Sequence, residues 1–194
     1  WVPILALVAV GTTINYLDRT VLSIAAPSLS RDLALTPTAM GLVFSAFFIG
    51  SMFGIVVVAG LIDRIGVVKP FVLGLVLFGI GLTIGGLTPS MPILIVARFI
   101  QGIGGGVIPP VAYVAIGRTL PAPLRPRMFA MMSTAWLLPG LAGPAIAGFI
   151  AEHTTWRLVF LGLLPLIVVS GTMAYRGLRG VGDEIHVLPF GVDV

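Results

Sequence analysis

Two stretches of this 194-residue sequence place charged and amide side chains inside long apolar runs. Asn15, Asp18 and Arg19 stand in the first stretch, and Arg98 and Gln101 stand three residues apart in a later one. Helical spacing would put each set on one face of its helix. A charge at the centre of a bilayer costs about 2.5–3.5 kcal/mol on insertion scales, so such groups persist where they face water, a solute or one another.

These residue types indicate a lined solute path. Asp18 could carry a proton as its access to water changes, and we predict that the solute is bound by Asn15, Tyr16, Arg19 and Gln101. Two other interpretations stay open, because Asp18 and Arg19 could neutralise each other and Arg98 could extend to the membrane surface. The sequence shows no nucleophile–base pair, so we expect no catalytic residue and no enzyme.

The composition places the chain in a membrane. Hydrophobic residues make up 58% of it and charged residues only 9%, with a mean hydropathy of +1.14, whereas soluble domains carry roughly 25% charged residues. The net charge of +4 comes from basic residues scattered between apolar runs, which argues against a nucleic-acid partner. With no cysteine and two histidines, we expect no metal site.

Six apolar runs are long enough to cross a bilayer as helices, which need about 20 residues each. They cover residues 2–27, 39–62, 70–88, 92–117, 127–151 and 156–176. We therefore expect an all-α integral membrane protein with a six-helix bundle over residues 1–179. Residues 180–194 would form a cytoplasmic tail or the start of a linker to a second six-helix half, encoded in the same gene or supplied by a second copy.

The basic residues of the connecting segments predict the orientation. The connections after the second, fourth and sixth runs hold Arg64, Lys69, Arg118, Arg125, Arg127, Arg176 and Arg179, and the others hold Arg31 and Arg157. Because cytoplasmic loops carry an excess of Lys and Arg, both chain ends are predicted to be cytoplasmic. We expect a multi-pass protein of the bacterial cytoplasmic (inner) membrane.

The connection between the second and third runs resembles the signature loop of the major facilitator superfamily. Gly60, Asp63, Arg64, Gly66 and Lys69 match that signature. Val67 and Val68 depart from it, since basic residues are usual there. The resemblance implies that this loop gates the transporter by stabilising its outward-open state.

The later runs are also similar to this family, so the resemblance covers nearly the whole chain. Arg98, Gln101 and the glycines after them resemble the pattern of the family's fourth span, whose arginine implies a role in proton coupling. In the fifth run, Pro139, Gly140, Gly143, Pro144 and Gly148 resemble the helix-kink motif of proton-driven antiporters. Ala147 stands where that motif usually has a second glycine.

The first run resembles two branches of the family. Residues Ile14 to Arg19 and Leu22 to Pro27 are similar to anion–cation symporters, in which the arginine contacts the substrate carboxylate and the aspartate takes part in proton coupling. That branch usually has a glutamate at the position of Gly105. Asp18, Thr20 and Pro27 also resemble the first span of multidrug efflux proteins.

The resemblance implies a proton-coupled secondary active transporter of small organic solutes, and the fifth-run motif favours efflux by solute–proton antiport. Proton-coupled uptake of organic anions is the alternative, and a non-transporting membrane scaffold or sensor is a second one. Asp18 and Arg98 would couple protons. We expect no cofactor, with the proton gradient as driving force and the solute and lipid bilayer as partners.

Overall fold

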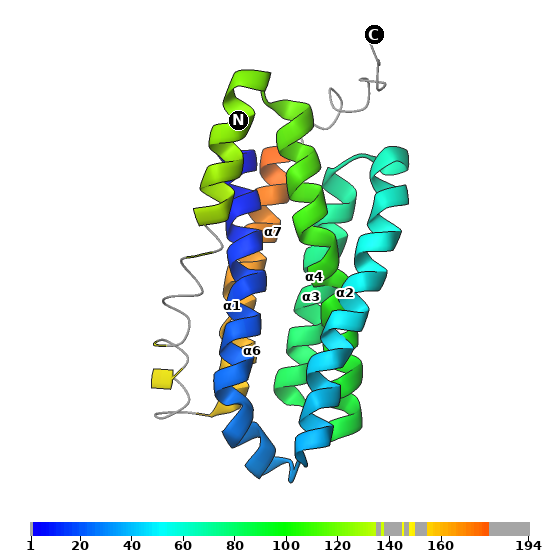
Figure 1. The fold of residues 1–194 in the computed structure, drawn as a ribbon, viewed down its shortest axis with the longest axis vertical. Coiled ribbons are helices and arrows are strands. Elements are labelled where there is room, and N and C mark those ends of the chain that lie inside the picture. Colours follow the sequence, from blue (N-terminus) through cyan, green and yellow to red (C-terminus); the bar gives the residue numbers. More distant parts are fainter. Residues whose placement is uncertain (1, 135–136, 138–144, 146–147, 150–154, 179–194) are drawn as a thin grey trace.

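The structure, a computed structural model, is a bundle of helices that run along one long axis (Figure 1). It describes residues 2–134, 137, 145, 148–149 and 155–178. The helices are α1 (Val2–Asp32), α2 (Pro37–Ile65), α3 (Val68–Leu87), α4 (Met91–Thr119), the 3₁₀ helix η1 (Ala122–Leu124), α6 (Trp156–Leu161) and α7 (Leu164–Leu178). Residues 125–134 are also helical, and the described residues contain no strand.

The first four predicted spans correspond to α1 to α4. Among the described residues, α2, α3 and α4 each have the length and composition needed to cross a membrane, and residues 156–172 form a shorter apolar stretch. The prediction of an all-α membrane protein is confirmed. Most of the fifth predicted span and the whole 180–194 tail lie outside the described residues.

The sixth predicted span is two helices rather than one. α6 ends at Leu161 and α7 begins at Leu164. Pro165, at the start of α7, has no N–H for the preceding turn, and its ring clashes with the carbonyl four residues earlier. An apolar run of the right length therefore predicted the span but not its break.

Helix α4 makes most of its contacts with α2 and α3. Glycines on α2 and α4 let these two helices pack closely. A side chain at any of four glycines would clash with a backbone carbonyl oxygen of the facing helix. These glycines are Gly50 and Gly54 on α2 and Gly102 and Gly106 on α4. The predicted small-residue faces therefore meet each other, as in other tightly packed membrane helices.

A buried tryptophan joins α1 to α6 at the end of the bundle opposite the α2–α3 connection (Figure 1). The indole N–H of Trp156 donates to a carboxylate oxygen of Asp32 at 2.8 Å, and Trp156 is 1% exposed. Buried tryptophan N–H groups usually find such a partner. This contact fixes the last turn of α1 against a segment 124 residues later in the chain.

Candidate functional site

Three of the predicted polar residues form a closed hydrogen-bonded cluster between α1 and α4. One terminal guanidinium nitrogen (NH1) of Arg98 donates to Oδ2 of Asp18 at 2.8 Å and to Oε1 of Gln101 at 2.6 Å. The amide nitrogen of Gln101 donates to the other carboxylate oxygen of Asp18 at 2.8 Å. Both oxygens of Asp18 are thus satisfied by two side chains of α4.

This cluster is buried. Asp18, Arg98 and Gln101 are each at most 3% exposed. Asp18 therefore pairs with Arg98 rather than with its neighbour Arg19, and Arg98 does not extend to the surface. Charge-assisted bonds of this kind are what make an ion pair tolerable in an apolar interior.

Asn15 lies one helical turn before Asp18 and also points at α4. Its side-chain nitrogen donates to the carbonyl oxygen of Gly105 at 2.7 Å, and its own Oδ1 is buried without a hydrogen-bond partner in the described structure. A Cβ on Gly105 would lie 2.8 Å from that amide nitrogen and 3.2 Å from the ring of Phe47. The space that a glutamate would need at this position is therefore filled by Asn15 and by aromatic rings.

Arg19 points in a different direction from Asp18 and is only half-buried. Its guanidinium carbon lies 5.6 Å, 5.1 Å and 5.4 Å from the ring centroids of Tyr16, Phe47 and Phe48. Within the described residues, the Nε atom of Arg19 is buried without a hydrogen-bond partner. Aromatic rings stabilise a cation at these distances, but they do not neutralise its charge.

Phe47 connects the two arginines. Its ring centroid lies 4.5 Å from the guanidinium carbon of Arg98 and 5.1 Å from that of Arg19, and the residue is 1% exposed. The sequence reasoning missed Phe47, because a phenylalanine in an apolar span looks like any other packing residue. Its helical position on α2 gives no signal of the two cations that it contacts.

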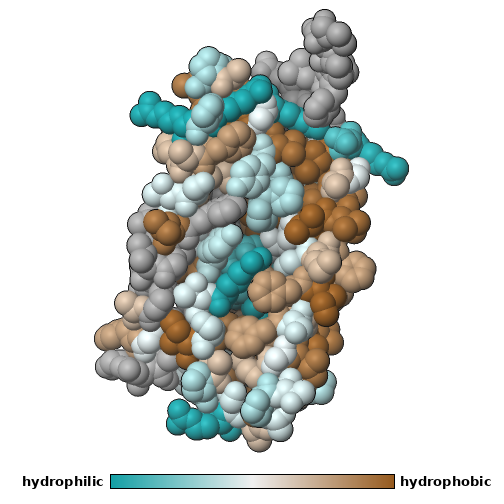
Figure 2. Space-filling view, in the orientation of Figure 1, coloured by the Kyte–Doolittle hydropathy of each residue, from teal (hydrophilic) through white to brown (hydrophobic). Residues whose placement is uncertain are grey.

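The surface agrees with a polar site at mid-height. Figure 2 shows hydrophilic groups at both ends of the molecule and also near the middle of the face drawn, where apolar side chains surround them. Tyr16, Arg19 and Thr20 of α1 keep part of their surface exposed. Asn15 and Gln101, both predicted to bind solute, are instead fully enclosed in the bundle.

The predicted gating loop lies at the end of the bundle. A terminal guanidinium nitrogen of Arg118, from the last turn of α4, donates to a carboxylate oxygen of Asp63 at 2.9 Å. Gly66 has a φ of 78° and its N–H donates to the carbonyl of Ile62, so it ends α2 in a conformation that favours glycine. Gly60 lies in α2 beside open space, and Arg64 and Lys69 are exposed.

The predicted helix-kink motif falls mainly outside the described residues. Pro139, Gly140, Gly143 and Pro144 are not described. Gly148 is helical, and an added Cβ there would meet no described atom within 4 Å. The role predicted for this motif stays a prediction.

Residues 8–184 match the sequence model of the Major Facilitator Superfamily. The chain is 31% identical over 193 residues to the niacin transporter NiaP of Acinetobacter baylyi, covering 95% of this chain and 44% of NiaP. It is 28% identical over 154 residues to the multidrug efflux pump SdrM of Staphylococcus aureus, covering 79% of this chain and 34% of SdrM. The chain thus spans less than half the length of these relatives.

A solved structure has the same fold. The partially occluded, inward-open xylose transporter XylE from E. coli superimposes with a TM-score of 0.82 at 18% sequence identity. The match covers 95% of this chain and 54% of XylE. At this level of identity the likeness concerns the fold and not the solute.

Proposed function

Because the chain belongs to the Major Facilitator Superfamily, we propose that it forms the N-terminal half of a proton-coupled secondary active transporter of small organic solutes. The relatives described above are named as transporters or pumps, which indicates a transporter rather than an enzyme. The solute site would lie at mid-membrane between this bundle and a second six-helix half, as in transporters built from repeats.

The buried cluster of Asp18, Arg98 and Gln101 carries this proposal. Intramembrane ionisable groups that pair with each other are typical of proton relays. The carboxylate of Asp18 is the one group in the cluster that can gain a proton and become neutral. A proton on either oxygen of Asp18 would remove the negative charge that Arg98 binds and leave a guanidinium without a counterion.

This step would link protonation to movement. Asp18 belongs to α1, and Arg98 and Gln101 belong to α4, so the cluster holds the two helices together. Neutral Asp18 holds α4 less strongly, which would favour a different packing of α1 on α4. Release of the proton would restore the ion pair, and α1 would return to its earlier packing on α4.

The geometry favours an organic anion as the solute. Asp18 is already neutralised by Arg98, whereas Arg19 is partly accessible and is surrounded by aromatic rings. A carboxylate reaching Arg19 would gain a charge-assisted hydrogen bond, and an apolar or planar solute body would contact Phe48. The resemblance to NiaP supports this version, since niacin is a small organic acid.

Efflux by solute–proton antiport is the second candidate. It is supported by the printed names of SdrM and of the putative multidrug resistance protein MdtD of Salmonella, which is 32% identical over 172 residues and of which the chain covers 36%. In that version the ion pair between Asp18 and Arg98 would open during transport. The proton and the solute would then compete for binding to the protein in this open form.

The protein is a multi-pass membrane protein. We propose that it lies in the bacterial cytoplasmic membrane with both ends in the cytoplasm. The beginning of α1, the α2–α3 connection and the end of α7 lie at one end of the bundle (Figure 1). This arrangement supports placing all three on the same side of the membrane. The excess of basic residues at this end supports the cytoplasm as that side.

Proton coupling is tested by Asp18→Asn in the full-length protein. We expect the variant to insert normally in proteoliposomes and to lose solute flux driven by a pH gradient, while solute exchange without a gradient continues. Asp32→Asn, which alters a carboxylate at the end of α1, serves as the control and should keep coupled flux. Unchanged coupled flux in Asp18→Asn would remove Asp18 from the mechanism.

The solute class is tested by thermal unfolding of the purified protein, since a ligand stabilises the state that it binds. We expect benzoate, an organic anion, to raise the melting temperature and Arg19→Gln to abolish that rise. Stabilisation by the lipophilic cation tetraphenylphosphonium alone would favour drug efflux. No effect of either probe, together with no flux, would favour a scaffold or sensor.

A further inference from the structure

The only asparagine and the only glutamine of this sequence lie on the facing surfaces of α1 and α4. Asn15 and Gln101 are both 0% exposed, although the side chains of Asn and Gln are mostly exposed in proteins. Each bonds across the helix contact, Asn15 to the carbonyl of Gly105 and Gln101 to Asp18. An amide offers both donors and an acceptor, so it can serve a partner that changes between the two roles.

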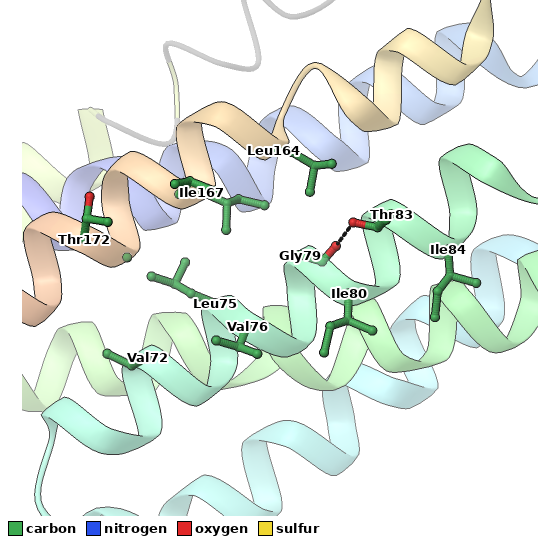
Figure 3. A pocket seen from close by; sticks show the side chains of 12 residues that line it. Val72, Leu75, Val76, Gly79, Ile80, Thr83, Ile84, Leu164, Ile167 and Thr172 are labelled. Carbon is green, nitrogen blue, oxygen red and sulfur yellow. Dashed lines mark hydrogen bonds between the residues drawn. The ribbon is translucent and has the colours of Figure 1, made fainter.

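Hydroxyl side chains in the spans behave differently. The Thr83 hydroxyl, in the apolar pocket between α3 and α7, donates to the carbonyl oxygen of Gly79 at 2.8 Å (Figure 3). Ser51 likewise donates to the carbonyl oxygen of Phe47 on its own helix at 2.9 Å. Such bonds stay within one helix. The bond from Gln101 to Asp18 instead depends on how α4 packs on α1.

Both ends of the Gln101 amide contact groups that protonation of Asp18 would change. The amide nitrogen donates to Oδ1 of Asp18 at 2.8 Å, and the amide oxygen, Oε1, accepts from NH1 of Arg98 at 2.6 Å. The same NH1 donates to Oδ2 of Asp18 at 2.8 Å. One guanidinium nitrogen therefore lies between the amide oxygen of Gln101 and the second carboxylate oxygen of Asp18.

A proton bound at Oδ2 would have an acceptor next to it. An ionised carboxylate only accepts hydrogen bonds, whereas a protonated carboxyl also donates one. The N–H of Arg98 and the new O–H of Asp18 would then compete for Oε1 of Gln101. If Arg98 withdraws, rotation of the two remaining side chains brings Oε1 to the O–H group. The bond from the amide nitrogen to Oδ1 already exists, so the acid and the amide would close a ring of two hydrogen bonds.

Arg98 is the ion-pair partner of Asp18 in the described structure. Arg19 is near Asp18 in sequence, but its guanidinium carbon lies by the rings of Tyr16, Phe47 and Phe48. Helices α2, α3, α6 and α7 carry charged residues only near their ends. Withdrawal of Arg98 would therefore leave Gln101 as the hydrogen-bond partner that Asp18 already has.

Packing fixes Gln101 more firmly than Arg98. A Cβ on Gly81 of α3 would clash with the backbone nitrogen and the Cβ of Gln101, so α3 lies directly behind this residue. The Nε atom of Arg98 is buried without a hydrogen-bond partner among the described residues. Once Asp18 is neutral, the guanidinium loses its counterion, and Arg98 is the member of the cluster that moves.

We propose that Gln101 is the hydrogen-bond partner of protonated Asp18, and that its amide oxygen exchanges Arg98 for the new O–H group. This inference rests on the proton coupling proposed above. The proton comes from water and forms the O–H bond at Oδ2, while Arg98 keeps its own protons and its charge. Two neutral hydrogen bonds hold α1 and α4 less strongly than the charged cluster, but they keep Asp18 and Gln101 opposite each other.

Infrared difference spectroscopy of the full-length protein in lipid tests this proposal. The carbonyl band of a protonated carboxyl lies at a lower frequency when the group makes more hydrogen bonds. A band that appears on acidification and is missing in Asp18→Asn belongs to Asp18. We expect a shift of this band to higher frequency in Gln101→Met, which keeps the Cβ beside Gly81 but removes the amide donor and acceptor.

Asn15→Leu is the matched control for the infrared experiment. Asn15 is the other buried amide at this helix contact, and its Oδ1 has no hydrogen-bond partner among the described residues, which makes it the rival acceptor. The Asp18 band should keep its wild-type frequency in this variant. A band that stays in place in Gln101→Met, or that shifts as far in Asn15→Leu, would overturn the proposal.

Thermal unfolding gives a second measurement that needs no protonation. Asp18→Asn carries a permanently neutral amide of nearly the same shape as a protonated carboxyl. Gln101→Met should lower the melting temperature by about 1–4 °C in the wild-type protein, and by at least half as much in the Asp18→Asn background, where an amide pair replaces the acid–amide pair. A loss confined to the wild-type background would show that Gln101 serves only ionised Asp18, which would overturn the proposal.

The infrared experiment also separates failure of this inference from failure of the proposed function. If acidification produces no band that Asp18→Asn removes, Asp18 takes up no proton, and the proposed proton coupling fails together with the role of Gln101. If the band belongs to Asp18 but Gln101→Met leaves it unchanged, proton uptake by Asp18 stands and only the role of Gln101 fails.

Discussion

Among the residues that the structure describes, two ion pairs of almost the same length lie in two different environments. Arg98 and Asp18 are 2.8 Å apart in the middle of the bundle, with side chains 2% and 3% exposed. Arg118 and Asp63 are 2.9 Å apart at the end of the bundle, with side chains 25% and 72% exposed. If distance alone decided, the two ion pairs would contribute equally to the stability of the protein.

Burial separates them. Water screens the Asp63–Arg118 pair, and such exposed pairs contribute about 0–1 kcal/mol. The Asp18–Arg98 pair has lost its water, so each charge depends on the other, and removal of one partner typically costs about 3–5 kcal/mol. The Asp63–Arg118 pair can therefore open and close at little cost, whereas separating Asp18 from Arg98 would leave two buried charges without a partner.

The largest effect is expected from Asp18→Ala. The variant leaves the charge of Arg98 buried without a partner and should lower the free energy of unfolding by about 3–5 kcal/mol, measured by denaturant titration in detergent. The double variant Asp18→Leu/Arg98→Met removes both charges and should regain most of the loss. A cost for Asp18→Ala no greater than that of Asp63→Ala would contradict the comparison.

Packing provides the second contrast between the middle and the end. Gly106→Ala places a methyl group against the backbone carbonyl oxygen of Ser51 and should cost about 1–3 kcal/mol in the same titration. Gly60→Ala, on the same pair of packed helices but beside open space, should be neutral or stabilise by about 0.5–1 kcal/mol. Equal effects at the two positions would show that the helices separate easily.

Phe47→Leu should have a somewhat smaller effect. It keeps an apolar side chain but removes the ring that lies near both arginines, at a cost of about 1–2 kcal/mol. Phe48→Leu is the matched control, because Phe48 is 53% exposed and its ring lies near Arg19. If both variants lose the same stability, burial of the ring does not strengthen its interaction with the cations.

The smallest effect on stability is expected from Asp63→Ala. The loss should be at most about 1 kcal/mol at low salt and should shrink as salt screens the pair. Titrations at two salt concentrations measure this dependence. A large loss that does not respond to salt would mean that the pair is shielded from water by the rest of the carrier.

The sequence predicted the spans well, because the length and composition of an apolar run are local properties. Residues 39–62 and 70–88 fall within one to three residues of α2 and α3. Pro165 was visible in the sequence, but a single proline in a span is tolerated often enough that the break after Leu161 could not be predicted.

The polar site was predicted in part. Asp18, Arg98 and Gln101 were selected because charged and amide groups are rare at such depth, and the structure brings them together. The partner of Asp18 could not be predicted, because Arg98 lies 80 positions away and the sequence does not give the packing of α1 on α4. Phe47 and Gly105 shape the site through contacts across helices, and such contacts leave no local pattern.

The Asp18–Arg98 pair also has a consequence for biosynthesis. The two residues are 80 positions apart, and ribosomes add about 5–20 residues per second. Asp18 therefore emerges about 4–16 seconds before its partner is made. During that interval α1 carries a carboxyl group that no residue of α4 can yet pair with, so we expect this group to be hydrated until the fourth helix is made.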